Sequence, residues 1–176
     1  MKGLKMKTRI FVIALLTIIL VGCAGSQMST MKQTNPPAKN INVIAIAPGS
    51  GPFGDAIGVE LFNLGFQIVD SNETAAIIGR AGLKEFEIYK PEGYSTFKER
   101  GIEAILTAKT VDVNGVPESA SVRITNTTDG TILVGVTWQN GWGGKRGSIA
   151  DRTMRKNLSA AAQDIAKELS KRLRIQ

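Results

Sequence analysis

The stretch Ile41–Asp70 reads INVIAIAPGSGPFGDAIGVELFNLGFQIVD and decides the fold class. Its first seven residues form a continuous apolar, β-branched run, which is typical of a strand buried on both faces of a sheet. A Gly/Pro turn follows, and apolar residues then recur at helical spacing until Gly65, which stands where a helix ends. Phe66–Asp70 is strand-like again. This β-α-β order predicts two parallel strands joined by a right-handed crossover.

Three more strand-like segments follow later in the chain, at Glu103–Val113, Val116–Thr125 and Thr131–Gln139. The first two are separated only by Asn114-Gly115, a dipeptide that favours a tight hairpin between alternating segments. We therefore expect an antiparallel three-strand meander.

The last element is expected to be an amphipathic helix. Ser148 would be its N-cap, Asp151 would lie in its first turn, and apolar residues would follow one stripe from Met154 to Leu173. Between the two strand regions the pattern is weaker. It favours a short helix capped by Ser71, a strand and a helical turn; the last two are expected at Glu85–Tyr89 and Ser95–Arg100. The whole predicts a single α/β (α+β) domain, residues 41–176, with a mixed sheet and packed helices.

Composition narrows the function classes. The chain has 176 residues, no His and one Cys, with 22 Lys+Arg against 15 Asp+Glu. The absence of His removes the usual general base and the commonest transition-metal ligand, and one Cys completes no thiolate zinc site. These counts argue against most hydrolases and metalloenzymes. We expect a non-enzymatic binding or assembly protein without a metal or other cofactor.

The N-terminus resembles a bacterial lipoprotein signal peptide. Four basic residues precede the 12-residue apolar run Ile10–Val21, which is shorter than the roughly 20 residues that span a bilayer. The run leads into Gly22-Cys23, which resembles a lipobox. This resemblance implies cleavage after residue 22 and acyl chains, palmitate among them, on Cys23, which anchor a protein far more stably than one myristoyl chain. Ala24, rather than Asp, follows the Cys and favours the outer membrane, with the domain in the periplasm.

Residues 24–40 read AGSQMSTMKQTNPPAKN and contain no aromatic residue. Such a segment has too little apolar surface to fold by itself, so we expect residues 23–40 to comprise the acylated Cys and a flexible tether. Fully extended, this tether would reach about 60 Å.

The positive charge gathers near the C-terminus. Loss of residues 1–22 would lower the net charge from +7 to +3, yet nine basic and three acidic residues follow Gly144. A basic stretch fits nucleic acid, an acidic partner or anionic lipid headgroups. An envelope location argues against nucleic acid, and a solvated helix face is the simplest interpretation.

Gly49, Gly51 and Gly54 fit the pattern G-x-G-x-x-G between a strand and a helix, and Asp70 ends the next strand. In dinucleotide-binding domains such a turn holds a pyrophosphate and the carboxylate binds the ribose. The rest of the chain lacks further parallel β-α units. The alternative is that the glycines make a tight turn, with Gly54 and Gly58 allowing close packing. Cofactor binding is therefore the second hypothesis.

Both tryptophans lie near the predicted junction between the last strand and the last helix. Trp138 is expected to point into the core. Trp142 lies in a glycine-rich loop with Lys145 and Arg146. Exposed aromatic residues beside cations favour interfaces, so these three residues are candidates for partner binding. The other interpretation is that the loop folds back and Trp142 covers the sheet.

The pattern of the folded part resembles a known periplasmic domain. The residues that carry the resemblance are INVIAIAP at 41–48, LGF at 64–66, GIEAILT at 101–107 and SVRITNTTDGTILVGVTW at 121–138. This α/β domain is shared by the curli-secretion-channel lipoproteins, the lipoprotein activator of bifunctional penicillin-binding proteins and the N-terminal domain of the Tol-system β-propeller protein. The resemblance implies a non-enzymatic scaffold, channel component or activator in a secretion, cell-wall or appendage complex. Its partner would be another envelope protein or a second copy.

Overall fold

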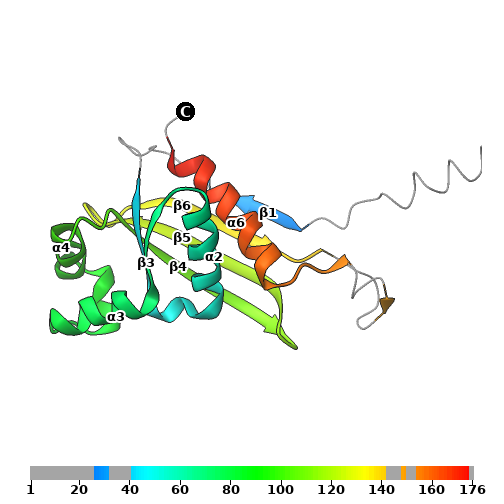
Figure 1. The fold of residues 1–176 in the computed structure, drawn as a ribbon, viewed down its shortest axis with the longest axis horizontal. Coiled ribbons are helices and arrows are strands. Elements are labelled where there is room, and N and C mark those ends of the chain that lie inside the picture. Colours follow the sequence, from blue (N-terminus) through cyan, green and yellow to red (C-terminus); the bar gives the residue numbers. More distant parts are fainter. Residues whose placement is uncertain (1–25, 32–40, 142–147, 150–153, 175–176) are drawn as a thin grey trace, which may run out of the picture.

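The computed structural model describes residues 26–31, 41–141, 148–149 and 154–174. They form one α+β domain around a six-stranded mixed sheet in the order β1-β6-β5-β4-β2-β3. Helices pack on this sheet, and the last helix crosses it beside the first strand (Figure 1). The predicted fold class is confirmed.

The parallel part of the sheet comes from the β-α-β stretch. Strand β2 (Val43–Ile46) is parallel to β3 (Gln67–Val69), and helix α2 (Gly51–Asn63) connects them after a short 3₁₀ turn, η1 (Pro48–Ser50). A Cβ at Gly58 would lie 3.2–3.3 Å from Ile46 and Ile68, so the helix approaches the sheet closely there. Both predicted strands and the helix between them are confirmed.

The antiparallel part is the predicted meander of β4 (Ala104–Val113), β5 (Val116–Asn126) and β6 (Ile132–Gln139). Strand β4 is also parallel to β2, and this pairing makes the sheet mixed. Asn114 and Gly115 both have positive φ, 54° and 75°, as a two-residue type I′ turn requires. The Asn-Gly pair therefore closes the β4–β5 hairpin.

The first strand, β1 (Gln27–Thr30), differs from the expectation of a tether. It pairs antiparallel with β6 and forms one edge of the sheet, the blue arrow in Figure 1. Its sequence QMST is weakly apolar, so the pairing with β6 and the contacts described below stabilise it. Four residues of the predicted tether are thus part of the folded domain.

The last helix, α6 (Leu158–Leu173), starts later than predicted. Its N-cap is Asn157, whose side-chain oxygen accepts a hydrogen bond from the N–H of Ala160 at 2.9 Å, so the expectation that Ser148 caps this helix is wrong. Lys156 and Asn157 are not helical because Asn140 holds the backbone of Lys156 by hydrogen bonds. The predicted first-turn Asp151 lies outside the described residues.

The weakly patterned middle region consists of α3 (Ser71–Arg80), the 3₁₀ helix η2 (Glu85–Tyr89) and α4 (Pro91–Glu99). The strand predicted at η2 is wrong. The Glu87 carboxylate accepts the N–H of Lys84 at 2.9 Å and closes a helical turn instead. Asp70, not Ser71, caps α3, since its carboxylate accepts the N–H of Glu73 at 2.8 Å.

Two apolar cores lie on opposite faces of the sheet. The larger core joins α2 and α6 to one face, where Ile57, Trp138 and Ile165 are at most 1% exposed. The smaller core joins α3, η2 and α4 to the other face around Phe97 and Ile105, both fully buried. The sheet is thus covered on both faces near β2.

Candidate functional site

Strand β1 lies beside α6 and is tied to it by polar side chains at both ends. At its start the hydroxyl of Ser26 donates to Asp164 Oδ2 at 2.7 Å. At its end Arg172 Nη2 donates to Thr30 Oγ1 at 3.1 Å. Between them, the partly buried Met28 packs against the larger core. Side-chain hydrogen bonds therefore hold residues 26–30 against α6.

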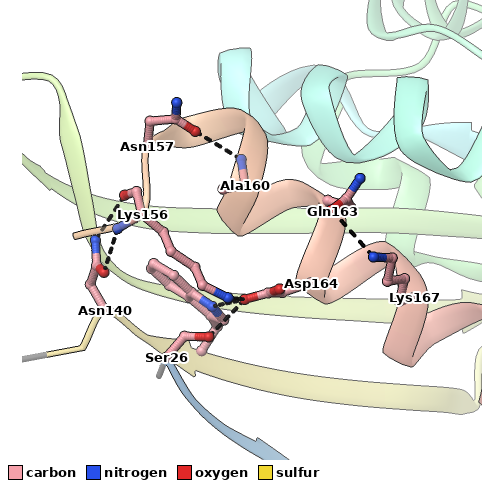
Figure 2. A network of polar contacts seen from close by, with 9 residues as sticks. Ser26, Asn140, Lys156, Asn157, Ala160, Gln163, Asp164 and Lys167 are labelled. Atoms are coloured by element: carbon pink, nitrogen blue, oxygen red, sulfur yellow. Dashed lines mark hydrogen bonds and ion pairs between the residues drawn. The ribbon is translucent and has the colours of Figure 1, made fainter. Parts of the chain in front are cut away.

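The carboxylate of Asp164 is the centre of this junction (Figure 2). Besides the hydrogen bond from the Ser26 hydroxyl, it accepts one from the indole N–H of Trp138 at 3.3 Å. It also forms an ion pair with the ammonium group of Lys156. The side chain of Asp164 is 23% exposed. A half-buried carboxylate with three donors thus joins β1, β6 and the segment before α6.

Opposing effects act on the pKa of Asp164. Partial burial raises it, but the hydrogen bonds from Lys156, Ser26 and Trp138 lower it more, and the positive charge of Lys156 adds to this. The pKa of this carboxyl therefore lies below its ordinary value. Asp164 is ionised at neutral pH and accepts all three hydrogen bonds.

Lys156 is brought to Asp164 by Asn140. The amide of Asn140 donates to the carbonyls of Pro117 at 2.7 Å and Lys156 at 3.0 Å, and its oxygen accepts the N–H of Lys156 at 3.0 Å. Asn140 is 9% exposed, so these bonds satisfy a buried amide. Asn140 fixes the chain just before α6 to the end of the meander.

A groove of about 360 Å³ runs between β1 and α6. The residues that line it are Ser26, Met28, Lys156, Asp164, Lys167, Glu168 and Lys171. Three ammonium groups and two carboxylates meet there. Point charges on flexible stems suit phosphate or carboxylate ligands.

A second groove, of about 520 Å³, lies on the face of the sheet opposite α6, across β1, β6, β5 and β4. Its lining combines small polar side chains, among them Ser29, Ser121 and Thr137, with apolar surface. Ser121 and Thr137 are exposed and face each other across the β5–β6 pair. Val111, 60% exposed, adds an apolar group. This surface offers hydroxyl and amide groups to a partner.

The glycine turn at residues 49–54, to which the dinucleotide-binding hypothesis refers, packs against other side chains. A Cβ at Gly49 would lie 2.7 Å from the carboxylate oxygen Oε1 of Glu85, and one at Gly54 would collide with Ser50. The hydroxyl of Ser50 is bonded to β4, where it accepts the N–H of Ala108 at 3.1 Å. A carboxylate beside Gly49 repels a phosphate.

Gly51 has φ of +59°, a value that favours glycine, and the turn needs this conformation. The carboxylate of Asp70 accepts the N–H of Glu73 as the cap of α3. These contacts give Gly49, Gly51, Gly54 and Asp70 structural roles in the turn and the cap. Cofactor binding by them stays a hypothesis that no contact here supports.

The other predicted site residues, Cys23, Trp142, Lys145 and Arg146, lie outside the described residues. Trp138 is buried, as expected. Within the described part of the chain, no group of three or more His, Cys, Asp or Glu side chains is arranged to hold a metal. No helix in that same part is both long enough and apolar enough to cross a membrane.

No protein-family model and no curated protein matches the chain. Among solved structures, it is similar to the PelC dodecamer from Paraburkholderia phytofirmans, at 14% identity and a TM-score of 0.49, over 86% of this chain and 100% of that one. A PelC variant gives the same values. Lipoprotein GNA1162 from Neisseria meningitidis is similar at 17% identity and a TM-score of 0.45, over 73% of this chain and 99% of that one.

Proposed function

We propose that this chain is a lipid-anchored protein of the bacterial envelope whose domain is a non-enzymatic docking or scaffold module. Cys23 carries the acyl chains, and the domain faces the periplasm from the outer membrane. The basic residues before a 12-residue apolar run that ends at Gly22-Cys23 support this anchor. Residues 1–22 are then the signal peptide.

The observation that carries the proposal is the position of β1. Its first residue, Gln27, comes four residues after Cys23, and Ser26 is already bonded to Asp164. Three residue steps join Cys23 to Ser26 and span at most about 11 Å. The folded domain is therefore held at the membrane surface, where its local concentration near other envelope proteins is high.

The partner surface is the groove on the open face of the sheet. Its exposed hydroxyl and amide groups can exchange hydrogen bonds to water for hydrogen bonds to a protein surface, and Val111 gives it an apolar contact point. Trp142, Lys145 and Arg146 follow β6 in the sequence, and β6 is one of the strands under this groove. An envelope protein or a second copy of this chain is the proposed partner.

The anchor is tested by metabolic labelling with a palmitate analogue and mass measurement of the mature protein. The wild type is expected to start at Cys23 and to carry label, and Cys23→Ala is expected to lose the label. Ser29→Ala, an exposed change on β1, is the matched control and should keep it. Label that persists in Cys23→Ala would refute the anchor.

The docking role is tested with a photo-crosslinking residue at Ser121 in cells. We expect one specific adduct that Thr137→Arg abolishes, because Thr137 lies directly across from Ser121. Crosslinkers at Trp142 and at Lys98, an exposed residue of α4, extend the test. The same partner at Trp142 would add residues 142–146 to the docking surface. Adducts at Ser121 that match those at Lys98, or that Thr137→Arg leaves unchanged, would overturn the docking role.

A further inference from the structure

The groove between β1 and α6 lies directly beside the proposed anchor. Ser26 lines it, and Cys23 is at most about 11 Å of chain away from Ser26. The polar headgroup layer of a bilayer leaflet is several Å thick. An acylated Cys23 therefore keeps the Ser26 end of this groove within about 11 Å of the membrane surface.

The charged side chains in and beside the groove between β1 and α6 differ in how closely they are paired with opposite charges. Lys156 forms an ion pair with Asp164, and Arg172 donates to Glu168 at 3.1 Å. Lys171 lies 3.9 Å from the other oxygen of Glu168, and its side chain is 69% exposed. This distance is at the limit of an ion pair, so the contact leaves the ammonium group largely hydrated.

Lys167 contacts a neutral amide rather than a carboxylate. Its ammonium group donates to the amide oxygen of Gln163 at 3.3 Å, and the side chain is exposed. Lys167 and Lys171 stand four residues apart, so they lie on one side of α6. Two cations, each with at most a weak partner among the described residues, thus face the same groove.

We propose that this groove binds the phosphate of anionic phospholipids in the leaflet that holds Cys23, with Lys167 and Lys171 as the binding cations. The inference rests on the proposed anchor and adds a second contact to it. The occupant follows from position and charge: each lysine next to an anionic membrane surface is attracted to it, and the attraction extends about one Debye length, about 8 Å. The contact orients the domain, with α6 toward the lipid and the open face of the sheet toward a partner.

The test uses the full acylated chain reconstituted into vesicles. Cys23 is the only cysteine, and acylation consumes its thiol, so one new cysteine is labelled uniquely. A fluorophore is placed at Ser159→Cys, an exposed position on α6 about two turns before Lys167, or at Glu92→Cys, exposed on α4. Quenching by a lipid with a spin-labelled headgroup is then compared between phosphatidylcholine vesicles with and without phosphatidylglycerol.

We expect the label at Ser159 to contact headgroups more often when phosphatidylglycerol is present, by about fivefold for each engaged lysine. The double variant Lys167→Gln/Lys171→Gln should lose this difference, and so should high salt. The matched double variant Lys84→Gln/Lys98→Gln, at exposed lysines on other elements, should keep it. The label at Glu92 should show no difference between the vesicles.

Flotation with the vesicles separates the two possible failures. If the chain floats with both vesicle types but quenching is equal in both, or is the same in Lys167→Gln/Lys171→Gln, headgroup binding is overturned and the anchor stands. Equal quenching is also what an acidic protein partner for the groove would give. If the chain carries no acyl group and does not float, both the anchor and the headgroup contact are overturned.

Discussion

The two edge strands of the sheet are held in different ways. Strand β3 is next to α2 and α3 in the sequence, and its residues Ile68 and Val69 pack against the two cores. Strand β1 contributes only Met28 to a core, and its ends are bonded to α6 through Ser26 and Thr30. One edge is thus held by apolar packing and the other mainly by backbone pairing and polar side chains.

This difference shows where the domain is able to open. Elements with few buried apolar contacts separate from a fold at lower free energy than the whole domain unfolds. Strand β1 has few such contacts and lies closest to the proposed anchor. A substitution that removes its hydrogen bonds to α6 is therefore expected to increase local opening of β1 alone. A substitution in the apolar core is expected to increase opening of both edge strands.

Ile57→Ala tests the apolar part of the comparison and has the largest expected effect. Ile57 is fully buried on α2, in the core that also contains α6. Its truncation should lower the free energy of unfolding by about 2–5 kcal/mol, measured by urea denaturation. Amide exchange should accelerate at β1 and β3 alike.

Val59→Ala on the same helix is the control, because Val59 is 60% exposed. It should change stability by about 0.5 kcal/mol or less. If Ile57→Ala accelerated exchange in β1 and left β3 unchanged, the two edges would not share a core as described.

Asp164→Ala tests the polar part. It leaves the indole N–H of Trp138 and the ammonium group of Lys156 without their common acceptor, at an expected cost of about 1–3 kcal/mol. Amide exchange is expected to accelerate in β1 and to stay unchanged in β3. Asp55→Ala, at an exposed position of α2, is the matched control. Uniform acceleration across the sheet would contradict the local role of Asp164.

Most of the fold follows from local patterns in the sequence. The apolar run of β2, the helical spacing of α2 and the Asn114-Gly115 turn each specify an element through residues that are neighbours in the chain. Strand β1 could not be predicted this way, since QMST becomes a strand by pairing with β6, more than 100 residues later. Glu85–Tyr89 alternates like a strand, but the cap made by Glu87 on Lys84 favours a 3₁₀ turn.

The junction at Asp164 was also missed, although one signal pointed to it. Trp138 was expected to be buried, and a buried indole N–H usually has an acceptor. The sequence offers several acidic residues in the last segment, and only the packing of α6 on β6 selects Asp164. Asn140 and Lys156 were missed for the same reason, because their bonds join segments that meet only in the folded domain.

Acid should weaken the same junction by a smaller amount than Asp164→Ala, because a protonated carboxyl still forms hydrogen bonds. The folded state holds the pKa of Asp164 below its ordinary value of 3.8, so it binds fewer protons than the unfolded state. The stabilisation is therefore complete above about pH 4 and is lost as the pH falls through the lower folded value. The methyl resonance of Met28 should shift in this acid range in wild type, and Asp164→Asn should abolish that shift. A shift that persists in Asp164→Asn would assign the acid response to another carboxyl, such as Asp129 or Glu87, whose pKa values are also lowered.

Ser26→Ala is expected to have the smallest effect on the difference between the two edge strands, because it removes one of the three donors to Asp164 and no apolar contact. Lys156 and Trp138 still bond to the carboxylate, and water reaches the vacated position, so the expected loss is about 1 kcal/mol. This loss should appear as faster exchange in β1 at an almost unchanged global stability. Ser95→Ala is the control, because the hydroxyl of Ser95 also makes one hydrogen bond, to the carbonyl of Pro91 in α4, far from β1 in the sequence. If the two serine variants accelerated β1 exchange equally, the hydrogen bond between Ser26 and Asp164 would not be what holds β1, the strand nearest the proposed anchor.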